Sequence, residues 1–135
     1  MQLFQIESAT ASEKILPKTK EISFKIFYIY FSLTFLCFLF YYLAGMNIFD
    51  AVAHSMTTIA TGGFSTHNES IGFFKSPLIE VISIIFIVLG SLPFITYLKF
   101  VMGEKKIFLS DSQIRGFLFL ILISILVMFL YLVVN

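Results

Sequence analysis

The sequence has few charged residues: Asp, Glu, Lys and Arg make up 13% of its 135 positions, against about 25% in a typical soluble domain. Hydrophobic residues make up 59%, with 18 Phe among them, and the mean hydropathy is +0.96. A globule of this size with so little charge would have no polar coat. The composition therefore argues against a soluble enzyme, a nucleic-acid binder or a disordered tail, and it indicates a membrane protein.

The sequence also lacks a second cysteine, a basic stripe and a signal peptide. Cys37 cannot form an internal disulfide and lies in an apolar run, where we expect it to pack as a small hydrophobe. The net charge is only +1, with no basic stripe for a phosphate backbone, so no nucleic-acid partner is expected. Residues 1–20 have neither the apolar core nor the small-residue cleavage site of a secretory signal.

Three apolar stretches are long enough to cross a membrane. A bilayer core about 30 Å thick needs roughly 20 mostly apolar residues of helix. The predicted spans are residues 24–44, 77–98 and 116–134. Within the second span, Gly90 and Pro93 allow a kink or hinge, or ordinary packing with a tolerated proline.

The segment between the first two spans contains a helix that is too short to cross. Asn47 and Asp50 have the spacing of a helix N-cap, and apolar residues recur at helical spacing over 48–59. Such a helix rises only about 18 Å. Gly62 and Gly63 then end it, because glycine readily adopts positive φ. A half-helix that breaks at glycines between two spans predicts a re-entrant pore loop.

The composition of this loop suits the passage of cations. Irregular backbone at membrane depth is tolerated where it lines a water-filled path, and cation filters use backbone carbonyls in place of the hydration shell. The C-terminal end of the short helix carries a partial negative charge that favours a cation. No Lys or Arg lies between Lys25 and Lys75 to repel one.

The basic residues predict an orientation. Positive charge gathers before the first span and between the second and third: Lys14, Lys18, Lys20 and Lys25, then Lys99, Lys105, Lys106 and Arg115. Only Lys75 lies in the intervening segment. The positive-inside rule therefore places residues 1–23 and 99–115 in the cytoplasm and residues 45–76 outside.

Residues 53–74, AHSMTTIATGGFSTHNESIGFF, closely resemble the second pore-loop region of bacterial TrkH-type potassium uptake proteins, which belong to the superfamily of Trk, Ktr and HKT transporters. Residues 13–17, 44–46 and 49–51 resemble that family's flanking segments. The resemblance implies an all-α membrane protein with four helix–pore-loop–helix repeats around one pore. This chain would hold one repeat, 24–98, and the first helix of the next, so we expect a fragment of a longer transporter.

The resemblance also implies site residues. Gly63 matches the family's filter glycine, within a filter at 60–65. The K⁺ ligands implied are backbone carbonyls, those of Ala60, Thr61, Gly62 and Gly63. The residues implied to support the filter are Thr58, Phe64 and Ser65. The residues implied to place negative charge at the outer mouth are Asp50 and Glu69. Asp50 is equally well explained as a helix cap, and His54 and His67 are expected to have structural or surface roles.

The function implied is potassium transport within a Trk-type uptake system of the bacterial inner membrane, without covalent chemistry or a cofactor. The partners implied are the lipid bilayer, the remaining repeats, a cytosolic nucleotide-binding regulatory subunit and a second copy. Two alternatives stay open. A small homo-oligomeric channel would take one filter strand from each of four chains, although the third helix argues against it. A non-transporting structural subunit, or an inactive remnant, would tolerate replacement of Gly63 with no change in ion flux.

Overall fold

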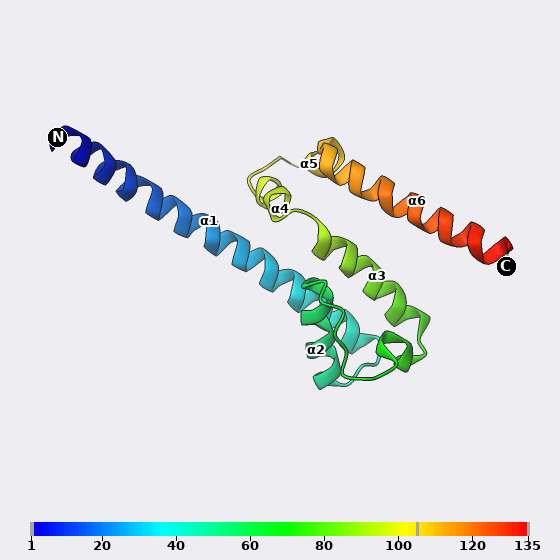
Figure 1. The fold of residues 1–135 in the computed structure, drawn as a ribbon. Coiled ribbons are helices and arrows are strands. Elements are labelled where there is room, and N and C mark those ends of the chain that lie inside the picture. Colours follow the sequence, from blue (N-terminus) through cyan, green and yellow to red (C-terminus); the bar gives the residue numbers. More distant parts are fainter. Residues whose placement is uncertain (1, 105, 135) are drawn as a thin grey trace. The chain divides into compact units, whose positions relative to one another are not determined.

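The computed structural model describes residues 2–104 and 106–134, and every regular element in these ranges is a helix (Figure 1). The expectation of an all-α fold is therefore confirmed for the described residues. The chain forms two compact units, residues 1–91 and 92–135. The first contains α1 (Gln2–Leu43), α2 (Ile48–Ile59), the 3₁₀ helix η1 (Ser70–Phe74) and α3 (Pro77–Ser91). The second contains α4 (Phe94–Val101), α5 (Ile107–Ser110) and α6 (Ser112–Val134).

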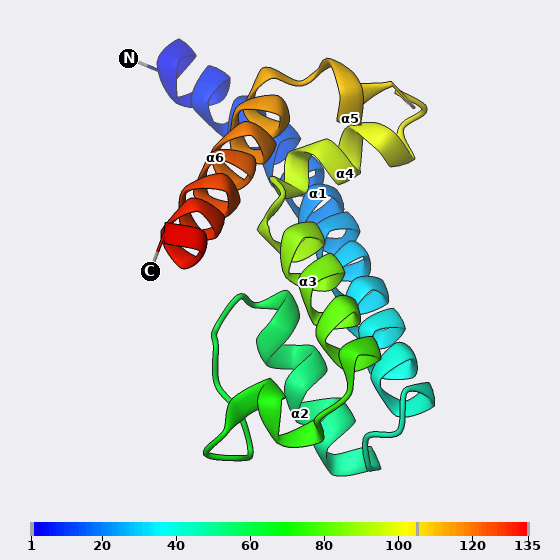
Figure 2. The ribbon, with the colours of Figure 1, turned by 90° about the vertical axis from the view of Figure 1, so that its right-hand side faces the viewer.

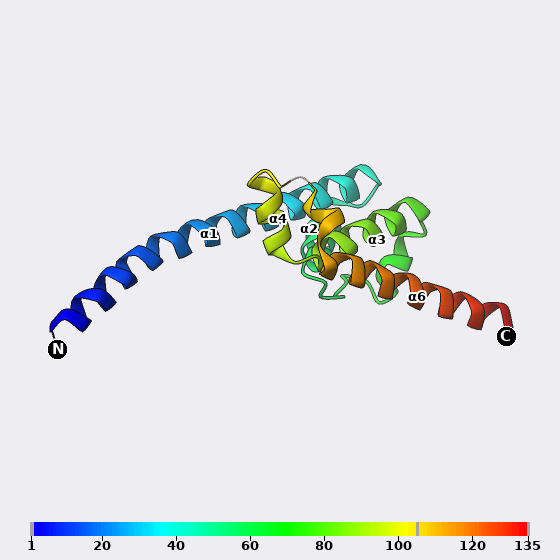
Figure 3. The ribbon, with the colours of Figure 1, turned by 90° about the horizontal axis from the view of Figure 1, so that it is seen from above.

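Two of the described helices are long and apolar enough to cross a membrane. They are the Lys20–Leu43 part of α1, which Figure 3 shows as one continuous helix, and the whole of α6. A third span results if α3 and α4 together cross as one broken helix. By length and composition, the described helices therefore offer two membrane spans, or three if the broken pair counts as one.

The structure divides the second predicted span into two helices, at the position where the sequence allows a kink or hinge. α3 ends at Ser91, and α4 begins at Phe94 with Pro93 as its N-cap. Proline has no amide hydrogen and its ring clashes with the preceding turn, while the residue before it is disfavoured in the helical region. Pro93 therefore ends α3 instead of only bending it.

The core of the first unit lies where α1, α2 and α3 meet (Figure 2). Its fully buried members include Cys37 and Tyr41 of α1 and Ala51 of α2. Cys37 is free and buried, as expected of a small hydrophobe. Within a bilayer, lipid is as apolar as these side chains, so close packing and interhelical hydrogen bonds hold such helices together.

The second unit leaves most of its apolar surface uncovered. α5 contacts both α4 and α6. Along α6, Ile114 is the buried residue, and no residue of its most apolar 18-residue window is buried. A helix that is apolar on all sides and uncovered by protein requires lipid or further protein around it.

Candidate functional site

The short helix α2 begins with a reciprocal cap. The Asn47 side chain accepts a hydrogen bond from the Asp50 amide at 2.8 Å and donates its own amide hydrogen to Asp50 Oδ2 at 2.7 Å. The Asp50 carboxylate lies in the first turn, where the helix dipole favours negative charge. This capping starts the helix at Ile48, the residue at which the sequence pattern places its start.

The helix ends in a Schellman motif. The Thr61 amide donates to the Thr58 carbonyl at 3.1 Å, and the Gly62 amide donates to the Thr57 carbonyl at 2.8 Å. Thr61 has a φ of +50°, which is rare for a β-branched residue. Gly63 follows with a φ of +72°. The two left-handed residues are thus Thr61 and Gly63, whereas the sequence pattern assigned this role to Gly62 and Gly63.

Four successive exposed residues at the end of α2 have carbonyls that accept no backbone hydrogen bond among the described residues. Residues 60–63 are all exposed. Over the described ranges, no backbone amide donates a hydrogen bond to the carbonyls of this row, which belong to Ala60, Thr61, Gly62 and Gly63. Four successive carbonyls therefore have no backbone partner in the described ranges, directly at the partly negative end of α2. We call residues 60–64, up to and including Phe64, the carbonyl strand.

A cavity of about 210 Å³ lies between the carbonyl strand and the helices next to it. It is lined by His54, Thr57, Thr58, Thr61, Gly63, Phe64, Ser70, Ile71, Ser83 and Ile87. Side chains of α2, η1 and α3 contribute to this lining, and the surface that they present to the cavity is mostly apolar.

A buried tyrosine joins the end of α2 to both longer helices of the first unit. Tyr41 Oη lies 2.8 Å from Thr58 Oγ1 and donates to Ser83 Oγ at 2.9 Å. Ser83 in turn donates to the Ile79 carbonyl at 2.8 Å. Because the Tyr41 hydrogen is used on Ser83, Thr58 is the donor in the first bond. Thr58, predicted to support the filter, therefore takes part in a link among α1, α2 and α3.

Gly90 of α3 lies against the last residue of α2. A Cβ added at Gly90 would lie 2.6 Å from the Ile59 carbonyl oxygen. No side chain fits at that distance without a shift of backbone, so glycine here permits the two helices to approach. This contact supports the packing role for Gly90 that the sequence left as one of two alternatives.

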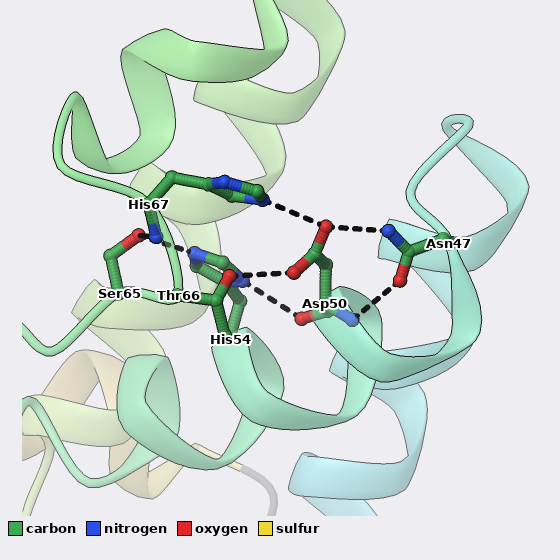
Figure 4. Close-up of polar contacts among 6 residues, drawn as sticks. All are labelled: Asn47, Asp50, His54, Ser65, Thr66 and His67. Carbon is green, nitrogen blue, oxygen red and sulfur yellow. Dashed lines mark hydrogen bonds and ion pairs between the residues drawn. The ribbon is translucent and has the colours of Figure 1, made fainter.

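The loop beyond the carbonyl strand returns to the start of α2 (Figure 4). Asp50 Oδ1 accepts from Thr66 Oγ1 at 2.6 Å, and Oδ2 accepts from His67 Nε2 at 2.9 Å. Asp50 is only 3% exposed. The hydrogen bond from His67, with a further contribution from Thr66, holds the pKa of Asp50 below its usual 3.8. Glu69, the other predicted mouth charge, is exposed.

His54 makes a second connection to the same loop. Its Nδ1 lies 2.8 Å from the Asp50 carbonyl, and its Nε2 lies 2.8 Å from Ser65 Oγ. A carbonyl only accepts, so the neutral ring carries its hydrogen on Nδ1, and Ser65 donates to Nε2. Ser65 Oγ also accepts from the His67 amide at 3.1 Å. His54 is buried at 2% exposure, which agrees with a structural role.

The two histidines, expected to have structural or surface roles, belong to one cluster. Their ring centroids are 6.4 Å apart, and His67 stacks on Phe73 with a centroid distance of 3.6 Å. Sequence reasoning missed this cluster because its members lie 11 to 17 positions apart, a separation without a periodic signal. Within the described ranges no group of three or more His, Cys, Asp or Glu is arranged to hold a metal ion.

Comparison with known proteins agrees with the family suggested by the loop. The TrkH family model, described as a cation transport protein, matches residues 2–135. The chain is 39% identical over 127 residues to a Trk system potassium uptake protein TrkI of Halomonas elongata, covering 93% of this chain and 26% of the relative. It is 38% identical over 137 residues to a Trk system potassium uptake protein TrkH of Vibrio parahaemolyticus, covering 98% of this chain and 28% of the relative.

A TrkH protein of Escherichia coli is 37% identical over 121 residues, which cover 87% of this chain and 25% of that relative. The chain thus spans about a quarter of the length of the curated relatives it matches. Because the family model and the relatives each cover most of it, this chain belongs to the TrkH family of cation transport proteins, which are transporters and not enzymes.

Proposed function

We propose that the chain is part of a Trk-type potassium uptake transporter and that its carbonyl strand supplies one strand of the selectivity filter. The observation that carries the proposal is the run of four exposed residues, 60–63, whose carbonyls accept no backbone hydrogen bond among the described residues and which lie directly after the C-terminal end of α2. The names of the relatives, Trk system potassium uptake proteins, support K⁺ as the ion.

The chemistry of the strand is that of a dehydrated cation site. Carbonyl oxygens replace the water that K⁺ loses on entering a filter, and the negative end of α2 stabilises the ion there. The ligands proposed are the carbonyls of Thr61, Gly62 and Gly63 together with that of Ala60. Thr58, Phe64 and Ser65 support the strand. The exposed Glu69 attracts cations to the outer mouth. Asp50 is buried and hydrogen-bonded, and its negative charge adds to the electrostatic attraction of cations there.

The proposal includes an arrangement in the bacterial inner membrane. Residues 24–44, 77–98 and 116–134 cross it, and α2 enters from outside and returns through residues 60–65 as a re-entrant loop. Residues 1–23 and 99–115 face the cytoplasm. The other filter strands come from further repeats of a longer protein. A cytosolic nucleotide-binding subunit and a second copy are the remaining partners in this proposal.

Potassium uptake at limiting external K⁺, in cells that lack their own uptake systems, tests the filter assignment. The chain is expressed with its genomic flanking sequence and carries Gly63→Asp or, as a control, Gly72→Asp. A Cβ added at either glycine meets nothing within 4 Å, so crowding does not distinguish them. We expect Gly63→Asp to abolish rescue and Gly72→Asp to retain it.

Other outcomes favour the alternatives. Full uptake by the Gly63→Asp protein would overturn the filter assignment and favour a structural subunit. Rescue by the 135-residue chain expressed alone would favour the small oligomeric channel.

A further inference from the structure

The far end of the carbonyl strand is tied to the first two turns of α2. Five residues make the connection, and we call them the outer clasp: Asp50, His54, Ser65, Thr66 and His67 (Figure 4). Two of them come from α2 and three from the loop that follows Phe64. Ser65, the first of the three, is two positions from Gly63.

The outer clasp complements the Schellman motif at the other end of α2. That motif fixes the near end of the strand through the Thr61 and Gly62 amides. The clasp fixes the far end through the Asp50 carboxylate and the His54 ring. The strand is thus held at both ends by one rigid helix, about 18 Å long.

The hydrogen bonds of the clasp are saturated around a buried charge. The Asp50 carboxylate accepts from Asn47, Thr66 and His67 and is almost inaccessible to solvent. Loss of one donor leaves a buried acceptor unsatisfied, which costs more than an average hydrogen bond contributes. Between the Schellman motif and the clasp, Gly63 and Phe64 make no hydrogen bond among the described residues, so the position of this part of the strand depends on the two attachments.

We propose that the outer clasp is a positioning element for ion selection: it fixes the spacing of the Ala60–Gly63 carbonyls, so that the strand discriminates K⁺ from Na⁺. This inference rests on the proposed filter function and adds to it a set of residues that contact no ion. K⁺ and Na⁺ differ little in size, so a strand free to move by a fraction of an ångström accepts both.

Paired substitutions at Thr66 test the proposal. Thr66→Val keeps the shape of the side chain and removes the donor to Asp50, whereas Thr66→Ser keeps the hydroxyl. Both are measured in the chain with its genomic flanks, as the KM and maximal rate of K⁺ uptake and the preference for K⁺ over Na⁺. We expect Thr66→Val to raise KM and lower the preference, each by about tenfold, and Thr66→Ser to stay within about twofold of the parent.

A second pair of substitutions, at His67, provides the same comparison if the Thr66→Val protein does not accumulate in the membrane. His67→Phe retains a ring to stack on Phe73 but has no hydrogen to donate, and His67→Gln retains a donor. Asn68→Ala, at an exposed position of the same loop, is the control, and its uptake should match that of the parent.

The outcomes separate this inference from the proposed function. Parental KM and ion preference in the Thr66→Val and His67→Phe proteins would overturn the clasp proposal. A fall in maximal rate that is fully explained by a lower amount of protein in the membrane, with no change in KM or ion preference, would overturn it too. If Gly63→Asp still abolishes uptake in that case, the filter assignment stands. If Gly63→Asp has no effect, the filter assignment fails and the clasp proposal with it.

Discussion

Thr61 adopts a backbone conformation that is costly for its residue type. A left-handed φ costs an L-residue with a side chain about 1–2 kcal/mol, and the cost is felt most by β-branched residues such as threonine. Such a conformation persists only where its surroundings impose it. Here the Schellman hydrogen bonds from the Thr61 and Gly62 amides impose it. The first residue of the strand beyond the helix cap therefore carries strain.

Thr61→Gly should relieve that strain. We expect the free energy of unfolding to rise by about 0.5–1 kcal/mol, since glycine adopts positive φ freely but loses more entropy on folding. Thermal unfolding in detergent measures the change. Ser70→Gly is the control, because Ser70 also has a positive φ, +55°, but lies outside the strand. Both variants should gain stability, and only Thr61→Gly should alter ion preference; a Thr61→Gly protein less stable than the parent would contradict this account.

Asp50 should make the first unit sensitive to acid. Its pKa is lowered in the folded protein, chiefly by the hydrogen bond from His67, so its ionised form favours folding. That contribution is complete above about pH 4, the ordinary pKa of aspartate, and is lost as the pH falls through the lowered value. We expect the melting temperature of the parent to fall below pH 4 more steeply than that of Asp50→Asn, measured between pH 2 and 6. Parallel curves would show that folding does not lower the pKa of Asp50.

At the scale of elements, the parts that could be predicted are those with local causes. The Asn47 cap, the helical spacing and the glycines after Ile59 lie within a few residues of one another, and they delimit α2. The outer clasp could not be predicted, because it joins Asp50 to residues 16 and 17 positions later through a loop with no periodic pattern. The break between α3 and α4 falls at Pro93, where the sequence allowed a kink, but high hydropathy on both sides of Pro93 gave no sign of whether the helix would bend or end there.

The close approach of α3 to α2 at Gly90 predicts that a larger residue there destabilises the packing of the two helices. Gly90→Ala places a methyl group where only 2.6 Å separate it from the Ile59 carbonyl oxygen, so one helix must shift. We expect a loss of about 1–3 kcal/mol in the free energy of unfolding, in the range of overpacked cores. Gly116→Ala in α6 is the matched control, since a Cβ there meets nothing within 4 Å. That helix should instead gain about 0.5–1 kcal/mol. Equal effects of the two substitutions would refute the packing role of Gly90.

For the whole molecule, the distribution of basic residues predicts which side of the membrane each loop faces. Cysteine labelling tests this in cells that express the chain with its genomic flanks, with Asn68→Cys and Glu104→Cys as reporters at exposed positions. The positive-inside rule predicts that an impermeant reagent labels the first from outside, and labels the second only after the membrane is opened. The native Cys37 is buried and should stay unlabelled. Labelling of Glu104→Cys from outside would reverse the proposed orientation.

The left-handed backbone at Gly63 has a consequence for the variation that the family can tolerate. Every residue that the ribosome can place there, apart from glycine, is chiral and of the L form. The space around the position is open, with nothing within 4 Å of an added Cβ. Within this chain, volume therefore does not limit the site, whereas chirality does, because any encoded replacement is an L-residue, for which a φ of +72° is unfavourable. Mutational tolerance at Gly63 should thus be nearly independent of side-chain size, with alanine penalised for the same reason as leucine.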